Sequence, residues 1–276
     1  MNNPLSAVGA RMIGYADFAG RMFYFGLNIM AKCVTPRFYF AETVRQMYAI
    51  GVKSLLLTST AAFSVGIVLS MQTIGTLKTF GAVNYVTVVV GLAMVKELGP
   101  VLTALMVAGR AGAGITAELG AMKVTRQIDA LTVSSVDPVR FLAVTRFVAC
   151  MLTLPLLTIV SDILGILGGM IIGVQHGGID VHLYLSYTLQ YIKLADILPG
   201  LLKTVFFGME VGIVASYYGF AAGGGTSGVG ISTQASVVTT SLFILVSDVI
   251  FTRIFILIFG GWLTLICHII RSTYFI

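Results

Sequence analysis

Charged side chains are scarce in this sequence. Asp, Glu, Lys and Arg make up 10% of the 276 residues, whereas a soluble domain usually carries about a quarter. Hydrophobic residues make up 57%, and the mean hydropathy is +0.98. This composition excludes an ordinary soluble domain, because most of the chain must face lipid or other helices.

Motifs for metals, cofactors and covalent chemistry are also missing. Cys33, Cys150 and Cys267 show no CxxC spacing, and His268 beside Cys267 belongs to no cluster of metal-ligating residues, so we expect small buried hydrophobic residues instead of metal ligands or disulfides. The chain has no GxxxxGKS or GxxxxGKT phosphate loop, no HExxH and no serine–histidine arrangement in a recognisable context. We therefore expect no catalytic site, no metal and no cofactor bound by this chain.

Long apolar runs predict the fold class. Five segments are each at least the ~20 residues that a membrane-spanning helix needs. They are residues 54–77, 86–109, 147–175, 197–220 and 237–267. The sequence therefore predicts an all-α polytopic membrane protein, with a five-helix transmembrane domain over 51–267 and a C-terminal tail over 268–276.

Two shorter helical segments precede the first span, within residues 1–50. In 12–31, apolar residues recur at helical spacing opposite polar ones, and a second such stripe follows Thr35–Pro36, a pair that favours a helix start. Basic residues beside aromatic ones on an amphipathic helix are typical of the membrane surface. We predict an interfacial helix and an elbow helix; packing of these helices on the transmembrane bundle is the alternative.

Lysine and arginine set the expected orientation. Six of the 17 precede the first span and five lie between the second and third, whereas the opposite loops hold only Lys78 and Lys193. Cytoplasmic loops carry the excess of positive charge, and residues 1–10 lack the basic start and apolar stretch of a signal peptide. The N-terminus and the second–third connection are expected in the cytoplasm. After five spans, the C-terminus is expected in the periplasm.

The second–third connection reads as an amphipathic helix over 116–131. Its polar side chains are Glu118, Lys123, Arg126, Gln127 and Asp129. One interpretation is an ordinary solvated surface helix, and the other is a coupling helix that a cytoplasmic motor grips to move the membrane helices. Asp137–Pro138 then predicts an N-cap and a first-turn proline that start the third span.

Several charges lie inside the predicted spans, where a charge costs a few kcal/mol and normally faces protein or a water-filled cavity. Lys96 and Glu97 are adjacent in the second span, so they point about 100° apart on a helix and each needs its own partner. Lys203 lies in the fourth span and Asp248, interpreted as part of an interhelical pair, in the fifth. Salt bridges that join helices and a polar lining for a lipid headgroup are both open explanations.

An ordered set of motifs carries a family resemblance. The motifs are Lys96-Glu97-Leu98-Gly99-Pro100, Ala108-Gly109-Arg110-Ala111-Gly112, Thr116-Ala117-Glu118-Leu119-Gly120 and Val136-Asp137-Pro138. Together they resemble the MlaE/YrbE permease family, the membrane subunits of MCE-type ABC transporters, over about residues 51–261.

The resemblance implies a function and a set of partners. It implies a homodimer in the bacterial inner membrane that moves phospholipid between that membrane and the outer envelope and so maintains outer-membrane lipid asymmetry. The implied partners are a cytoplasmic ABC ATPase that binds ATP and Mg, a periplasmic ring of MCE-domain proteins and a small STAS-domain subunit. Nucleic acid is not an expected partner.

The resemblance also implies the site residues. A lipid pocket at the dimer interface would have Glu97 and Lys203 close to it. On the first span, a row at helical spacing supplies candidate neighbours of the lipid, with simple helix packing as the alternative: Leu69, Gln72, Thr76 and Phe80. Contact with the ATPase would fall to the polar side chains of the coupling helix, namely Glu118, Lys123, Arg126 and Asp129.

Three other functions compete with this one. An ion-coupled secondary transporter would use Lys96, Glu97 and Asp248 as a proton relay, but transporters of that kind are commonly built from internal repeats, and none is apparent here. An intramembrane enzyme would need the catalytic motifs that the sequence lacks. A subunit with a purely structural role in assembly is the third.

Overall fold

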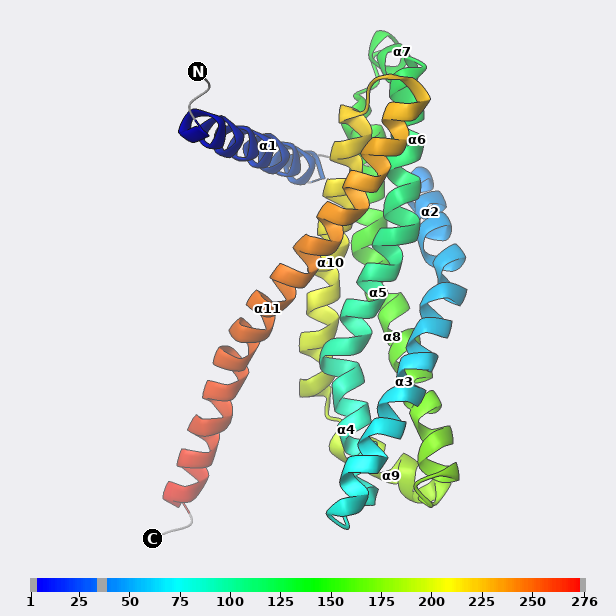
Figure 1. Ribbon diagram of the computed structural model, residues 1–276, viewed down its shortest axis with the longest axis vertical. Helices are drawn as coiled ribbons and strands as arrows, with labels where there is room; N and C mark the ends of the chain where they lie inside the picture. The colour runs from blue at the N-terminus through cyan, green and yellow to red at the C-terminus, as the bar shows by residue number, and fades with distance from the viewer. Residues whose placement is uncertain (1–3, 34–38, 274–276) are drawn as a thin grey trace. The chain divides into compact units, whose positions relative to one another are not determined.

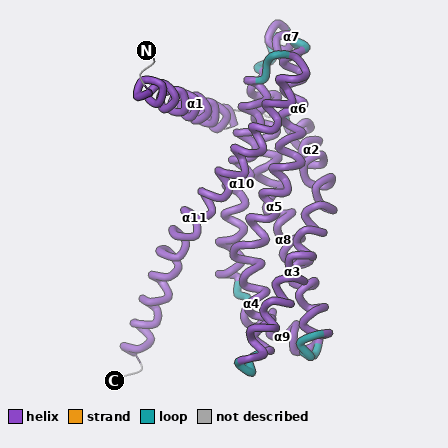
Figure 2. The backbone as a smooth tube through the Cα atoms, in the orientation of Figure 1, coloured by secondary structure: helices purple, strands orange, loops and turns teal. Residues whose placement is uncertain are grey.

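The computed structural model describes the backbone of residues 4–33 and 39–273, and side chains from residue 13 to residue 257 apart from residues 15 and 34–38. Within these ranges the chain is helical and contains no strand, as predicted (Figures 1 and 2). Thr35–Pro36, the side chain of Cys267 and the end of the expected tail lie outside the described residues.

The helices follow one another with short connections (Figure 1). Before the second span come α1 (Pro4–Cys33), α2 (Phe40–Met47) and α3 (Lys53–Thr79), with a π-helical turn, Tyr48–Val52, between the last two. Next come α4 (Val86–Ala93), α5 (Gly99–Val107), α6 (Ala113–Val124) and α7 (Gln127–Val133). The last four are α8 (Thr145–Gln175), α9 (Val181–Tyr191), α10 (Leu194–Ala221) and α11 (Gly225–Thr273).

Among the residues that the structure describes, five continuous helical stretches are long and apolar enough to cross a membrane, which confirms the predicted number of spans. They are Phe40–Thr79, Val83–Val124, Val139–Gln175, Leu194–Ala221 and Gly225–Leu257. Several of them start or end well outside the apolar runs, because polar residues extend the helices beyond those runs. The membrane-spanning helices therefore include α2 at one end of the first stretch and α6 at the end of the second.

Residues 219–236 form a glycine-rich segment without charge, and the sequence predicts a loop here between the fourth and fifth spans. The segment is mostly helical, so that prediction was wrong. Only residues 222–224 separate α10 from α11. Gly224 and Gly225 have positive φ angles of 77° and 73°, which glycine adopts without steric cost. The serines and threonines that made this segment look like a loop belong to the helix; Ser236, for example, is buried and bonded to Thr116.

The expected coupling helix over 116–131 is not one helix either. Its first part belongs to α6, and the helix stops at Val124. Arg126 lies in the left-handed region, with φ 59°, which is a common way for a helix to end. Glu118 therefore lies on the extension of the second span, whereas Asp129 lies on the separate short helix α7.

The chain divides into two compact units. The first is formed by Met1–Thr58, Met106–Leu157 and Val205–Thr240, and the second by Ser59–Leu105, Thr158–Thr204 and Ser241–Ile276. The core of the first unit joins Ile29 of α1 to a run of buried residues around Phe147. The opposite side of α1 leaves Phe23, Tyr24 and Leu27 exposed, so α1 packs on this unit along one face only. Contact of its exposed face with the membrane surface stays a prediction.

Glycines let helices of the second unit approach backbone to backbone. A Cβ atom on Gly66 of α3 would lie 1.9 Å from the carbonyl oxygen of Gly165 in α8, and one on Gly165 would lie 2.2 Å from Cε of Met94. Small residues at such positions permit close helix packing in membranes. In the sequence, Gly165, Gly169 and Gly173 recur every four residues, which predicts close helix contact, and Gly165 makes such a contact.

Two alanine substitutions on α3 test this packing. Gly66→Ala is expected to destabilise the protein by about 1–3 kcal/mol, since the backbone carbonyl of Gly165 would have to move. Gly75→Ala is the matched control, because its Cβ would meet nothing within 4 Å, and we expect it to be neutral or slightly stabilising. Thermal unfolding in detergent measures both. Equal unfolding temperatures for the two variants would contradict the proposed close contact.

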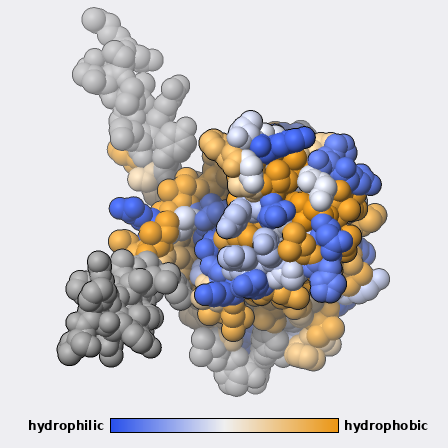
Figure 3. Space-filling view, turned by 90° about the horizontal axis from the view of Figure 1, so that it is seen from below, coloured by the Kyte–Doolittle hydropathy of each residue, from blue (hydrophilic) through white to orange (hydrophobic). Residues whose placement is uncertain are grey.

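One end of the second unit is polar and includes α9, a helix that we did not predict. Figure 3 views the molecule from this end and shows hydrophilic residues gathered across it among apolar ones. The Asp180 side chain accepts hydrogen bonds from the backbone of His182 and Leu183 at the start of α9, as an N-cap does. Tyr184 anchors α9, because its ring is fully buried in the core of the unit.

Asp137 starts the third span, as predicted. Its Oδ1 accepts hydrogen bonds from the backbone N–H groups of Val139 (3.0 Å) and Arg140 (3.4 Å), and its Oδ2 is paired with Lys32 of α1. Partial burial alone would raise the pKa of Asp137, but the bond to Lys32, the charge of Lys32 and the backbone bonds together lower it below the usual 3.8. The ionised carboxylate therefore stabilises the fold.

Replacing Asp137 tests this helix start. Asp137→Ala is expected to cost about 1–2 kcal/mol of stability, and Asp137→Asn less, because an amide oxygen can still cap the helix. A lowered pKa means that the carboxylate contribution is complete above pH 3.8 and is lost as the pH falls through the folded-state value. The stability gap between wild type and Asp137→Asn should therefore shrink in acid. Thermal unfolding of both proteins from neutral pH to about pH 3 measures this difference. A stability difference that widens as the pH falls would contradict the prediction.

Candidate functional site

A proline in the second span changes the helix at the charged motif. Pro100 has no N–H group for the carbonyl of Lys96, four residues earlier, and its ring would clash with that carbonyl in a regular helix. Met94–Leu98 forms a π-helical turn instead, and such turns are frequent at functional sites. Lys96 and Glu97 both lie on this turn, so the backbone irregularity and the two charges coincide.

Close packing of α10 brings Lys203 to this turn. A Cβ on Gly200 would lie 2.2 Å from the carbonyl oxygen of Val95, so only glycine permits the approach. Lys203 is three residues further along α10, on the same side of the helix. Its Nζ donates to the carbonyl of Lys96 (3.4 Å), which Pro100 cannot satisfy.

Lys203 is the centre of a polar cluster, which we define as Glu97, Lys203, Asp248 and Thr252. Its Nζ lies 2.6 Å from Oε2 of Glu97, 3.0 Å from Oδ1 of Asp248 and 2.6 Å from Oγ1 of Thr252. Thr252 in turn donates to the Glu97 carboxylate at 3.1 Å. The three N–H donors of the ammonium are thus shared among four acceptors, namely these three side chains and the more distant Lys96 carbonyl.

Burial differs sharply within the polar cluster. The Lys203 side chain is 2% exposed, that of Asp248 19% and that of Glu97 41%. Two carboxylates share one ammonium, so the cluster has a surplus of acceptor groups. The most exposed charged group of the cluster is therefore the Glu97 carboxylate, which Lys203 holds in place.

Lys96 has a partner of its own. Its Nζ lies 2.7 Å from Oδ1 of Asp196 at the start of α10. This confirms the prediction that Lys96 and Glu97 cannot pair with each other and need separate partners. Close by, Gly99 packs on Asp162 of α8, since a Cβ on Gly99 would lie 1.7 Å from Oδ1 of that side chain.

The four residues predicted to neighbour the lipid on the first span do not all lie on one exposed surface. Leu69 packs against the core of the second unit, while Gln72, Thr76 and Phe80 are exposed. No hydrogen bond links these four to Glu97 or Lys203 within the described part of the chain. A role for them in lipid contact stays a prediction.

Thr252 is the member of the polar cluster that sequence reasoning missed, and Asp248 was predicted as part of an interhelical pair or a proton relay but not as a neighbour of the lipid site. The available signal was their spacing: residues four apart lie on one face of a helix, and here that face carries the only aspartate of the fifth span. The interhelical pair predicted for Asp248 is confirmed, with Lys203 as its partner.

A second set of charges surrounds α6 and α7. Glu118 Oε2 lies 2.9 Å from Nη2 of Arg146, whose side chain is 2% exposed, whereas that of Glu118 is 54% exposed. Lys123 and Asp129 form a longer, exposed pair at 3.4 Å. A buried arginine that holds a surface glutamate makes Glu118 the most firmly fixed of the four predicted coupling residues.

Comparison with known proteins supports the family resemblance. The profile of the family "Permease MlaE" matches residues 43–254. A probable ABC transporter permease protein of Rickettsia bellii is 36% identical over 253 residues, which cover 92% of this chain and 98% of the relative. The intermembrane phospholipid transport system permease protein MlaE of Haemophilus influenzae is 35% identical over 253 residues, or 91% of this chain and 97% of the relative.

A third relative extends the comparison beyond these bacteria. A probable ABC transporter permease protein of Synechocystis is 36% identical over 238 residues, which cover 86% of this chain and 88% of the relative. The segment matched by the family profile, residues 43–254, contains the polar cluster and the charges of α6 and α7. This chain belongs to the MlaE permease family and is the multi-pass permease subunit of an ABC transporter.

Proposed function

We propose that this chain moves phospholipid between the inner membrane and the outer envelope, as a homodimer in the bacterial inner membrane with its N-terminus in the cytoplasm and its C-terminus in the periplasm. The observation that carries the proposal is the polar cluster around Lys203, which presents a fixed, partly exposed carboxylate from within membrane-spanning helices. The phospholipid transport function named for the Haemophilus relative supports it.

The proposed division of work assigns energy and substrate to different chains. A cytoplasmic ABC ATPase binds ATP and Mg and acts on α6 and α7, where Glu118, Lys123, Arg126 and Asp129 lie. A periplasmic ring of MCE-domain proteins receives or supplies the lipid, and a small STAS-domain subunit completes the assembly. Within the permease, apolar side chains hold the acyl chains and the Glu97 carboxylate contacts the headgroup.

Lipid retention and transport test the proposal together. Purified permease complex should retain phospholipid, detected by mass spectrometry of an organic extract. Glu97→Ala and Lys203→Ala should each reduce ATP-driven transfer of fluorescent phospholipid between proteoliposomes and acceptor vesicles. Absence of retained phospholipid, together with unchanged transfer in the double variant, would refute the lipid site.

A proton relay remains the second candidate, since two carboxylates meet at one ammonium in the polar cluster. It predicts transport driven by an ion gradient in proteoliposomes that contain the permease without its ATPase. The lipid transporter proposed above predicts no transfer under those conditions.

A further inference from the structure

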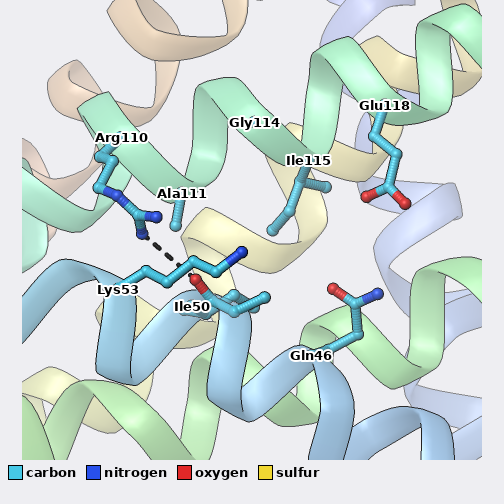
Figure 4. Close-up of a pocket in the computed structure, with 9 residues that line it drawn as sticks. Gln46, Ile50, Lys53, Arg110, Ala111, Gly114, Ile115 and Glu118 are labelled. Carbon is cyan, nitrogen blue, oxygen red and sulfur yellow. Dashed lines mark hydrogen bonds between the residues drawn. The ribbon is translucent and has the colours of Figure 1, made fainter.

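A pocket in the first unit lies between the first span and the helix that contains Arg110 and Glu118. None of its lining residues belongs to the polar cluster. It has a volume of about 190 Å³, room for several waters at about 30 Å³ each. Figure 4 shows Gln46, Ile50 and Lys53 extending into it from one helix and Arg110, Ile115 and Glu118 from another. Two cationic side chains therefore converge on one small cavity.

The Arg110 side chain is oriented by the helix opposite. Its Nη1 donates to the carbonyl of Ala49 (3.3 Å) and to Oγ of Ser54 (2.8 Å). A guanidinium group has five N–H donors in a fixed fork. Within the described part of the chain both of these bonds use Nη1, so the N–H groups of Nε and Nη2 are left for another acceptor. The Arg110 guanidinium is therefore held in one orientation and still has N–H groups that can donate to a ligand.

The net charge of the pocket is positive. Among the side chains that the structure describes, between residues 13 and 257, the Lys53 ammonium has no hydrogen-bond or ion-pair partner, and it points into the pocket (Figure 4). Glu118 is the only acidic residue in the lining, and its charge is compensated by buried Arg146 at 2.9 Å. Lys53 and Arg110 thus form a cationic surplus that fits an anion.

An exposed apolar stripe adjoins the pocket on the same helix. It consists of every fourth residue, each between 47% and 76% exposed: Phe40, Val44, Tyr48, Val52 and Leu56. The positive-inside rule places this end of the helix at the cytoplasmic surface, where anionic lipids attract basic residues. A cationic pocket beside an apolar stripe matches the two halves of a phospholipid.

We propose that Lys53 and Arg110 bind the phosphate group of an anionic phospholipid of the cytoplasmic leaflet, whose acyl chains lie along the Phe40–Leu56 stripe. Guanidinium and ammonium groups are the usual protein ligands of phosphate. This site is separate from the polar cluster and does not depend on the transport proposal. It would fix the first span against α6, the helix that carries Glu118.

Photoactivatable phosphatidylglycerol tests the site. The permease, in vesicles of phosphatidylethanolamine and phosphatidylglycerol, is cross-linked through a probe on the acyl chain, and labelled peptides are mapped by mass spectrometry. Labelling is expected on the peptide that contains the stripe, residues 40–56. Lys53→Gln should reduce it about fivefold, as expected for one basic residue near an anionic lipid surface. Lys78→Gln, at the other end of α3, should leave it unchanged.

Further arms separate the possible outcomes. Unlabelled phosphatidylglycerol should compete for labelling, whereas phosphatidylcholine and inorganic phosphate should not. Arg110→Lys keeps the charge and should retain more labelling than Arg110→Gln, with thermal unfolding confirming that each variant is folded. Equal labelling in Lys53→Gln and wild type would overturn the proposal, as would competition by inorganic phosphate as effective as that by the lipid.

Discussion

Replacing Lys203 with methionine is expected to abolish transport and to destabilise the protein by about 3 kcal/mol. The ammonium is 2% exposed and is the shared partner of Glu97 and Asp248. Its removal leaves two carboxylates facing each other inside membrane-spanning helices, and an uncompensated buried charge typically costs about 3–5 kcal/mol. The partial exposure of Glu97 places our expectation at the low end. Thermal unfolding and ATP-driven lipid transfer in proteoliposomes measure the two effects.

Removing a carboxylate along with the lysine should restore part of the stability but not the transport. Glu97→Gln combined with Lys203→Met leaves one carboxylate in place of two, so the double variant should be more stable than Lys203→Met alone. The coupling energy of such a cycle is typically about 0.5–3 kcal/mol for residues in contact. Lys203→Arg serves as the charge-preserving control. Strictly additive effects would show that Lys203 and Glu97 do not interact.

Composition was sufficient to predict the five spans, because the cost of placing polar residues in lipid applies to every window of the sequence. Helix geometry also predicted separate partners for Lys96 and Glu97, since that conclusion needs only the angle between neighbouring residues on a helix. The identity of those partners, Asp196 and Lys203, depends on which helices pack together. That packing rests on close approaches such as Gly200 on Val95, which a single sequence does not disclose.

Local rules failed where tertiary packing overrides them. The glycine-rich segment after Gly219 reads as a loop, yet most of it is helical because buried Ser236 and Thr240 find hydrogen-bond partners inside the unit. The π-helical turn at Met94–Leu98 could have been suspected from Pro100 alone. The break at Arg126 could not, since arginine seldom adopts a left-handed backbone conformation.

Glu118→Gln is expected to uncouple ATP hydrolysis from lipid transfer, and its effect on stability should be larger than that of Arg146→Met. The reason is the difference in exposure: Arg146 is 2% exposed and Glu118 54%. Removing the glutamate leaves a buried, uncompensated guanidinium, at a cost of about 3 kcal/mol. Removing the arginine leaves a carboxylate that water can solvate.

The neighbouring pair Lys123–Asp129 supplies the control for Glu118. It is exposed and 3.4 Å apart, so Asp129→Asn should change stability by less than about 1 kcal/mol. Glu118→Gln combined with Arg146→Met should recover most of the stability lost in Glu118→Gln. The amount of lipid transferred per ATP hydrolysed should stay low, because the surface charge that fixes this part of α6 is still absent. The ATPase rate and the lipid transfer rate are measured in the same proteoliposomes. A double variant that regains both stability and coupling would show that Glu118 acts only through the stability of the fold and not on the ATPase.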